Sequence, residues 1–379
     1  MRQAERIAQL RNEMQNQGVS GVFLPLNAHL EYFTGVRRTE TGNTPQRQNS
    51  AEYASFLITE TEVVYFNARL STAHQISADD SHPLVDRVIP FSDVDLSGTT
   101  FLNTCTELGL KGRKLAYLQD ISSSLVLRLQ EDLAVSWVNF DSVVQRMRAQ
   151  KDPEELQLME RAAAINDKIY DAIFPQLQPG VAIAEISREI DRLAQVFGAD
   201  TTSFPTNVMN LGPLGRMGEY YPVLRRGYVI AFDYGVLCQG YCSDFGRTVF
   251  VGEPDPVLVK AHELVMSAQK TAIAAMKAGK ITGMELNRIA RQVINDGGYD
   301  EEFVHRLGHG IGKDVHERPF LAEGEDRILE NGMCFTVEPS LRLTLPNCNG
   351  LVRVEDVIVV TPEGGQNLNT TTRELVVIE

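Results

Sequence analysis

Two segments of the chain place acidic residues inside runs of apolar, strand-forming residues. The first, residues 228–251, contains two β-prone runs separated by a short turn, which predicts a hairpin. If the turn lies at Cys238–Gln239, antiparallel pairing sets Asp233 directly opposite Asp244, with β-carbons about 5 Å apart. Two carboxylates that close repel each other, so one must take up a proton unless a cation lies between them.

The second segment, residues 333–360, repeats this arrangement. Glu338 and Glu355 each lie in an apolar run, and a turn centred on Pro346–Asn347 would set them opposite each other. A single acid in a strand usually lies at an edge or faces solvent, and either hairpin alone has that explanation. Two such hairpins in one chain favour a shared cation instead.

Three histidines lie between the two hairpins, in the sequence HRLGHGIGKDVH: His305, His309 and His316. One imidazole with four carboxylates suits a pair of divalent transition metal ions better than a closed thiolate zinc site. His309 stands between two glycines, which indicates close approach of the backbone around an imidazole. The stretch GHGIGK resembles a nucleotide loop, but no Ser or Thr follows the lysine and no clear strand precedes it, so we exclude a phosphate loop.

Composition narrows the classes of function. The 379 residues include 50 acidic and 36 basic side chains, and the net charge of −14 argues against nucleic acid or an anionic membrane as the main partner. Five cysteines without metal-type spacing indicate reduced thiols in a cytoplasmic protein. We expect no signal peptide, because the first helix is polar, and no membrane span, because no apolar run approaches about 20 residues.

Residues 1–148 are expected to form an α/β domain with a mixed sheet, because predicted strands and helices alternate. The expected helices cover the N-terminus up to Gly18 and the regions near 69–77, 98–108 and 122–133; the expected strands lie at 21–26, 54–60, 62–67, 86–91 and 114–119. The polar segment 37–50 is either a surface loop or a lid that contacts substrate or partner. His29, His74 and His82 are isolated and indicate no site.

Residues 149–379 are expected to form an α+β domain. Asp152, Pro153 and Glu155 form a helix cap, a first-position proline and a capping box, which sets the domain boundary near 148–152. Residues 184–200 align with 284–300, Asp233 aligns with Glu338, and Asp244 aligns with Glu355. This repeat predicts two halves related by a pseudo-twofold axis, with the acids of both hairpins converging there.

The ordered set Asp233, Asp244, His309, Glu338 and Glu355 resembles the five metal ligands of the pita-bread metallopeptidases, especially Xaa-Pro aminopeptidases and prolidases. The frames FDYG, SDFGRT, HGIG, VEPS and RVED carry the resemblance. It covers nearly the whole chain, and implies a creatinase-like N-terminal domain (1–148) and a pita-bread metallo-catalytic domain (149–379).

The resemblance implies roles for these residues. Asp244 and Glu355 would bridge two divalent ions (Mn, Co, Fe or Zn), Asp233 would complete one site, and His309 with Glu338 the other. Glu338 would also act as general base, taking a proton from a water activated by the ions. Three further residues are expected near the reaction. His305 and His316 would contact the substrate or serve as structural hydrogen-bonding groups, and Arg353 would lie beside Glu355.

The implied function is a cytoplasmic Xaa-Pro exopeptidase that removes an N-terminal residue or cleaves Xaa-Pro dipeptides, and the implied assembly is a homodimer. Two alternatives remain: a pita-bread enzyme that hydrolyses a C–N bond of a small non-peptide substrate, as creatinase or ectoine hydrolase do, and a non-catalytic relative. One departure stands out, because family peptidases carry a histidine about 17 residues before the first ligand Asp. Here that place holds Arg216, Met217 and Gly218, and the nearby candidates to replace it are Glu219, Tyr220 and Tyr221.

Overall fold

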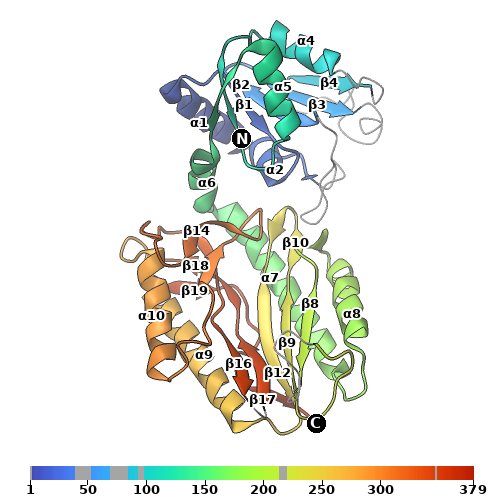
Figure 1. Ribbon diagram of the computed structural model, residues 1–379, viewed down its shortest axis with the longest axis vertical. Helices are drawn as coiled ribbons and strands as arrows, with labels where there is room; N and C mark the ends of the chain where they lie inside the picture. The colour runs from blue at the N-terminus through green and yellow to red at the C-terminus, as the bar shows by residue number, and fades with distance from the viewer. Residues whose placement is uncertain (1, 39–52, 69–83, 93–97, 213–219, 346–347) are drawn as a thin grey trace. The chain divides into compact units, whose positions relative to one another are not determined.

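The computed structural model describes residues 2–38, 53–68, 84–92, 98–212, 220–345 and 348–379. The chain divides into two compact units, residues 1–148 and 149–379 (Figure 1). Within the described residues, no helix has both the length and the apolar character needed to cross a membrane.

The first unit is built on a six-stranded mixed sheet with the strand order β4-β3-β2-β1-β5-β6. The pairs β1–β2 and β2–β3 are antiparallel and the remaining pairs are parallel. The strands are β1 (Gly21–Leu24), β2 (Ser55–Thr59), β3 (Val63–Ala68), β4 (Arg87–Phe91), β5 (Lys114–Tyr117) and β6 (Ser136–Asn139).

Two apolar layers surround this sheet. Helices α1 (Arg2–Gln17), α2 (Ala28–Thr34) and α6 (Asp141–Ala149) contribute to one buried cluster, and α4 (Thr99–Glu107) and α5 (Ser123–Leu133) to another. The five predicted strands and three of the predicted helices are confirmed. The sequence reasoning missed α2, α6 and β6, although Asn27 caps α2 through its side chain. The predicted helix near 69–77 and most of the segment 37–50 lie outside the described residues.

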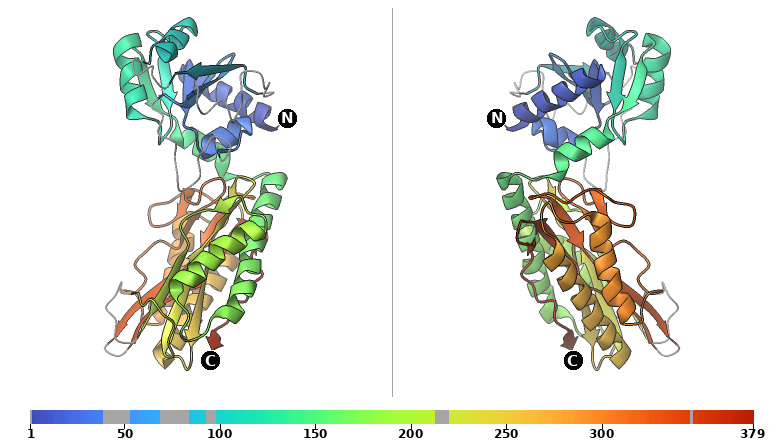
Figure 2. Two further views of the ribbon diagram at one scale, coloured as in Figure 1. Left: turned by 90° about the vertical axis from the view of Figure 1, so that its right-hand side faces the viewer. Right: turned by 90° about the vertical axis from the view of Figure 1, so that its left-hand side faces the viewer.

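The second unit contains two main sheets with a pair of helices on each. The first has the order β20-β12-β9-β8, and α7 (Pro153–Ile173) and α8 (Ile183–Val196) share a core cluster with it. The second has the order β14-β13-β15-β18-β19 and packs with α9 (Pro256–Ala275) and α10 (Gly283–Asp296). Figure 2 shows the strands between these two helix pairs. α8 and α10, both of 14 residues, occupy the aligned segments of the predicted repeat.

The strands of this unit fall between residues 201 and 378. They are β7 (Thr201–Thr202), β8 (Asn207–Leu211), β9 (Tyr228–Tyr234), β10 (Val236–Cys238), β11 (Tyr241–Cys242), β12 (Phe245–Val251), β13 (Gly308–Gly310), β14 (Glu317–Leu321), β15 (Cys334–Val337), β16 (Ser340–Leu345), β17 (Cys348–Arg353), β18 (Asp356–Val360), β19 (Gly365–Asn367) and β20 (Val376–Ile378). The predicted capping box of Asp152 and Glu155 begins α7.

The predicted register of the first hairpin is wrong. Asp233 pairs with Gly246 rather than Asp244, and Cys238 pairs with Tyr241, so the turn residues are Gln239 and Gly240. Both have positive φ angles, 49° and 81°, as a two-residue type I′ turn requires. Asp244 therefore lies diagonally across from Asp233, two residues before Gly246 and on the same face.

The predicted register of the second hairpin is confirmed. Val337 pairs with Asp356 in β15–β18, and Ser340 pairs with Arg353 in β16–β17. Glu338 and Glu355 lie between these pairs, in the same register. The predicted turn residues 346–347 lie outside the described residues, but the pair Leu345–Cys348 encloses them.

His262 on α9 makes the stability of this fold depend on pH. Its side chain is 1% exposed, and burial, assisted by Arg247, lowers the pKa of His262 to about 4. The unfolded chain, with a histidine pKa of about 6.5, therefore binds more protons below neutrality, and stability falls as the pH drops from about 6.5 to about 4. Between these pH values His262 should cost the wild type about 3 kcal/mol of folding free energy, and His262→Phe should remove this cost. Chemical denaturation of the metal-free protein at pH 7.5 and 4.5 measures it, and parallel losses in both proteins would contradict it.

Candidate metal centre

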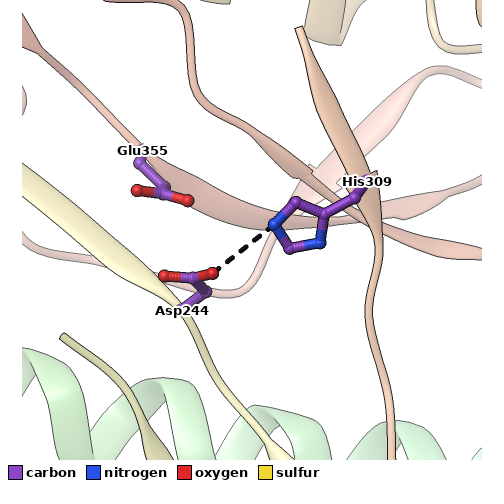
Figure 3. Close-up of side chains that lie close together, drawn as sticks. All are labelled: Asp244, His309 and Glu355. Atoms are coloured by element: carbon purple, nitrogen blue, oxygen red, sulfur yellow. Dashed lines mark ion pairs between the residues drawn. The ribbon is translucent and has the colours of Figure 1, made fainter. Parts of the chain in front are cut away.

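The five predicted ligands gather at one place in the second unit. Single ligand atoms of Asp244, His309 and Glu355 all lie within 4.8 Å of one another (Figure 3). His309 Nε2 lies 3.6 Å from Asp244 Oδ2 and 3.3 Å from Glu338 Oε1. Asp233 joins the group through Arg353, whose Nη1 lies 2.7 Å from Asp233 Oδ2 and 3.6 Å from Glu355 Oε2.

Backbone pairing brings the two hairpins together. Asp233 on β9 lies opposite Gly246 on β12, and Gly246 forms an isolated bridge with Glu355. A β-carbon at Gly246 would lie 2.8 Å from Glu355 Oε2, so only glycine leaves room for that carboxylate. A β-carbon at Gly308 would lie 1.9 Å from Thr336 O, which confirms the close backbone approach predicted beside His309.

The centre is buried and rich in negative charge. Asp244, Glu355 and His309 are 4%, 1% and 1% exposed. Burial raises the pKa of Asp244 to about 6, although the hydrogen bond with His309 opposes the shift. Burial, together with Asp244 and Glu338, raises the pKa of Glu355 well above its usual range. Each carboxylate therefore disfavours the ionisation of the next.

The donor set fits divalent cations. Asp244 Oδ1 and Glu355 Oε2 are buried and have no hydrogen-bond partner among the described residues. A buried carboxylate oxygen that accepts no hydrogen bond is costly, and a divalent cation between the two carboxylates would remove that cost. Four carboxylates and an imidazole are the ligands that divalent first-row metals accept.

His305 is held by protein groups at both ring nitrogens. Nδ1 lies 2.6 Å from Arg306 O, so it carries the proton and donates it to that carbonyl oxygen. Nε2 contacts the Ser340 hydroxyl, which donates to it when the imidazole is neutral. Burial lowers the pKa of His305 and favours the neutral form. A direct role of His305 on substrate stays a prediction, and would require its contact with Ser340 to open.

His316 is exposed and lies edge-on to His309, with ring centroids 4.2 Å apart. Partial desolvation of the ring is the main cause that lowers the pKa of His316 to about 4, and electrostatic repulsion from His309 and Arg306 adds to it. A neutral, exposed imidazole beside a candidate ligand is a group that substrate can contact.

Behind the predicted ligands lies a buried polar network that sequence reasoning missed. Arg247 Nη1 donates to Glu355 O at 2.8 Å, and its Nη2 to Asp356 Oδ1 at 2.7 Å. Gln269 Nε2 donates to Asp356 Oδ2 at 3.0 Å. Arg247 follows Asp244 by three residues, and Asp356 directly follows Glu355. Opposite charges inside two apolar strands were the sequence signal that could have indicated this ion pair. Thr336 Oγ1 accepts from the His309 backbone N–H at 3.1 Å and lies 3.2 Å from Glu338 Oε1.

The region of the absent family histidine is only partly described. Arg216, Met217, Gly218 and Glu219 lie outside the described residues. Tyr220 is exposed, and the Tyr221 ring lies 4.9 Å from the Tyr228 ring, tilted by 51°. Which group replaces the histidine stays a prediction.

Fold and site together define a metallohydrolase with the pita-bread architecture, as predicted. Residues 6–150 match the Creatinase/Prolidase N-terminal domain, and residues 157–362 match metallopeptidase family M24. The chain belongs to metallopeptidase family M24.

Several named proteins are similar to this chain along its whole length. The Xaa-Pro dipeptidase of Pyrococcus furiosus is 28% identical over 98% of this chain and 99% of its own. The crystal structure of a prolidase from Thermococcus sibiricus has a TM-score of 0.86 at 28% identity, covering 100% of both chains. An X-Pro aminopeptidase from Thermotoga maritima has a TM-score of 0.82 at 26% identity, covering 98% of this chain and 99% of that one.

Substituting Glu355 should change metal content and metal-free stability in opposite directions. Glu355→Gln removes a buried negative charge beside Asp244 and Glu338, so the metal-free protein should gain about 1 kcal/mol or more. The same change should reduce bound metal to less than half of the wild-type amount, because the amide is a poorer ligand. Elemental analysis and denaturation measure the two effects.

Glu363→Gln is the matched control, since Glu363 is exposed in the loop after β18. It should change neither quantity. Wild-type metal content in Glu355→Gln would refute the ligand assignment.

Proposed function

We propose that the chain is an Xaa-Pro exopeptidase that removes an N-terminal residue or cleaves Xaa-Pro dipeptides with the help of two divalent ions. The observation that carries the proposal is the buried cluster of Asp244, His309 and Glu355, in which one oxygen of each acid accepts no hydrogen bond from the described residues. Relatives that match the full length of the chain are named Xaa-Pro dipeptidase and prolidase. Because these relatives are named as peptidases, they do not favour the alternative function, hydrolysis of a small non-peptide substrate.

Two ions, rather than one, are supported by the number and placement of the acids. Asp233, Asp244, His309, Glu338 and Glu355 would hold them. Mn, Co, Fe and Zn all accept such a donor set. When bound, the ions supply Lewis acidity to the scissile carbonyl and lower the pKa of a water molecule.

The remaining groups of the chain position substrate and move protons. Glu338, whose side chain is 11% exposed, is the acid placed to accept the proton of the attacking water. Arg353 bridges Asp233 and Glu355 and holds their carboxylates in orientation. His316 would donate a hydrogen bond to the developing oxyanion or to the leaving nitrogen.

We also propose a cytoplasmic homodimer. Family resemblance supports the dimer. The thiols of Cys105 and Cys334 are buried and not paired in disulfides, as is usual in a reducing compartment.

Hydrolysis of Xaa-Pro peptides tests the proposal directly. Metal-loaded protein should release a free N-terminal residue, a chelator should abolish the release, and adding Mn²⁺ or Co²⁺ should restore it, because the ions supply the polarising charge. Product analysis by mass spectrometry measures the release. Metal-loaded protein that leaves every Xaa-Pro peptide intact would refute the proposal.

His316→Ala should lower kcat on such a peptide by about 100-fold without lowering metal content, because the imidazole acts on the reacting groups and does not hold an ion. Steady-state kinetics and elemental analysis of the same preparation measure both. A parallel loss of metal would instead make His316 a structural part of the site.

A further inference from the structure

His316 lies at the end of the loop that connects β13 to β14, and the residue after it, Glu317, begins β14. Exposed and buried residues alternate along 316–319, so these two neighbours point to opposite sides: His316 is exposed and Glu317 is buried. A peptide bond joins them directly. Any contact that fixes Glu317 therefore also restricts the position of His316.

Both carboxylate oxygens of Glu317 have partners. Oε2 forms an ion pair with Lys151 Nζ at 3.0 Å, and Oε1 accepts from the backbone N–H of Asp314 at 3.1 Å. The side chains of Lys151 and Glu317 are 3% and 6% exposed, so salt in the solvent screens their attraction only weakly. The carboxylate thus closes the turn 314–317 and ties it to a residue 166 positions earlier in the chain.

Lys151 has a fixed place in the second unit. Its backbone N–H donates to Gly332 O at 2.9 Å, and the following residue, Asp152, is the N-cap of α7. Lys151 Nζ also donates to Ala149 O at 3.4 Å. The ammonium group therefore reaches the loop from a segment of backbone that is itself held in place.

The first part of the loop is fixed as well. The backbone N–H of Cys242 on β11 donates to Gly312 O at 2.7 Å. A β-carbon at Gly312 would lie 2.7 Å from Lys151 Cε and 3.0 Å from Glu317 Oε2, so the loop passes directly over the ion pair. The loop is thus held at residue 312 and at residue 317, with His316 between these two points.

Two further charged residues, Lys313 and Glu155, meet at the ring of Tyr241. Lys313 Nζ lies 4.1 Å from the centre of that ring, and the Tyr241 hydroxyl donates to Glu155 Oε1 at 2.7 Å. These contacts tie the loop to β11 and α7. They leave the carboxylate of Glu317 to Lys151, at the end of the loop that carries His316.

We propose that Lys151 is a positioning residue, whose buried ion pair with Glu317 holds the His316 imidazole edge-on to His309, where the proposed reaction needs it. Without the ammonium group, the Glu317 carboxylate would be a buried charge without a counter-ion. Such a group turns toward water, and Glu317 would carry the adjoining His316 away from His309. The inference rests on the proposed peptidase function, and it adds to that function a residue that acts through His316.

Kinetics of Lys151→Met on an Xaa-Pro peptide test the inference. The variant should retain the wild-type metal content and lose about 10- to 100-fold in kcat, because a displacement of a reacting group by about 1 Å has an effect of this size. In the His316→Ala background the same change should alter kcat less than about two-fold, because two residues that act through one group are not additive. A general loss of stability would lower kcat in both backgrounds.

Two companion variants separate the charge from the fold. Glu317→Asp retains both charges, which favours folding, but it shortens the side chain by one methylene and should also lower kcat. Adding Glu317→Gln to Lys151→Met should restore most of kcat, because a neutral amide is buried at much lower cost and still accepts from Asp314 N–H.

Two matched controls should keep the wild-type kcat. Lys168→Met removes an exposed ammonium group from α7. Ile186→Ala destabilises the same unit by opening a cavity beneath α8, far along the chain from the loop.

Nuclear magnetic resonance provides a readout that needs no hydrolysis. Among the signals of the seven histidines in metal-free, isotope-labelled protein, the one that His316→Ala removes belongs to His316. The ring of His309, 4.2 Å away, displaces this signal from its position in an unfolded chain. Lys151→Met and Glu317→Asp should move it toward that position, and Lys168→Met should leave it in place.

The outcomes separate the inference from the proposed function. A wild-type kcat or an unmoved His316 signal in both Lys151→Met and Glu317→Asp overturns the inference, as does an equal loss of kcat with and without His316. A His316 signal that depends on Lys151, in a protein that hydrolyses no Xaa-Pro peptide, overturns the peptidase function and leaves the positioning by Lys151 standing.

Discussion

Mutual repulsion among four buried carboxylates is the constraint on which this structure depends. Asp233, Asp244, Glu338 and Glu355 face one another, where water does not screen their charges. Arg353 offsets part of the repulsion, because its guanidinium lies between Asp233 and Glu355. The ring of His309 lies beside the other two acids, Asp244 and Glu338. Two buried oxygens, Asp244 Oδ1 and Glu355 Oε2, still accept no hydrogen bond in the described structure. The metallopeptidase family to which the chain belongs meets this need with divalent ions.

A polar frame behind the ligands holds these charges in place. Arg247 joins the strands of both hairpins, because it donates from β12 to the backbone of Glu355 and to the carboxylate of Asp356. Gln269 on α9 reaches the same carboxylate and also donates to Val337 O at 3.0 Å. Both residues are only 1–2% exposed. A buried charge whose hydrogen bonds are all satisfied fixes the strands around it, and here those strands carry or adjoin the predicted ligands.

Sequence predicted the parts of this arrangement that depend on local pattern. The register of the second hairpin follows from the symmetric placement of Glu338 and Glu355, and the start of α7 follows from Asp152 and Glu155. The first hairpin was misplaced because Gln239 takes a positive φ, a choice made by the turn and not by the apolar pattern. The partners of His305 and Arg247 could not be predicted, since Ser340 and Asp356 are 35 and 109 residues away.

The frame also includes the C-terminal segment. Arg247 Nε donates to Thr372 O at 2.8 Å and Nη2 to Thr371 O at 3.0 Å, so these carbonyl groups saturate the guanidinium. Asp167 on α7 holds the same segment, accepting from Thr370 N at 2.7 Å and Thr371 Oγ1 at 2.7 Å. α7 and α9 thus play corresponding parts in the two halves: each places one buried polar side chain, Asp167 or Gln269, that leads to Arg247. The repeat therefore extends from the predicted ligands to the side chains that support them.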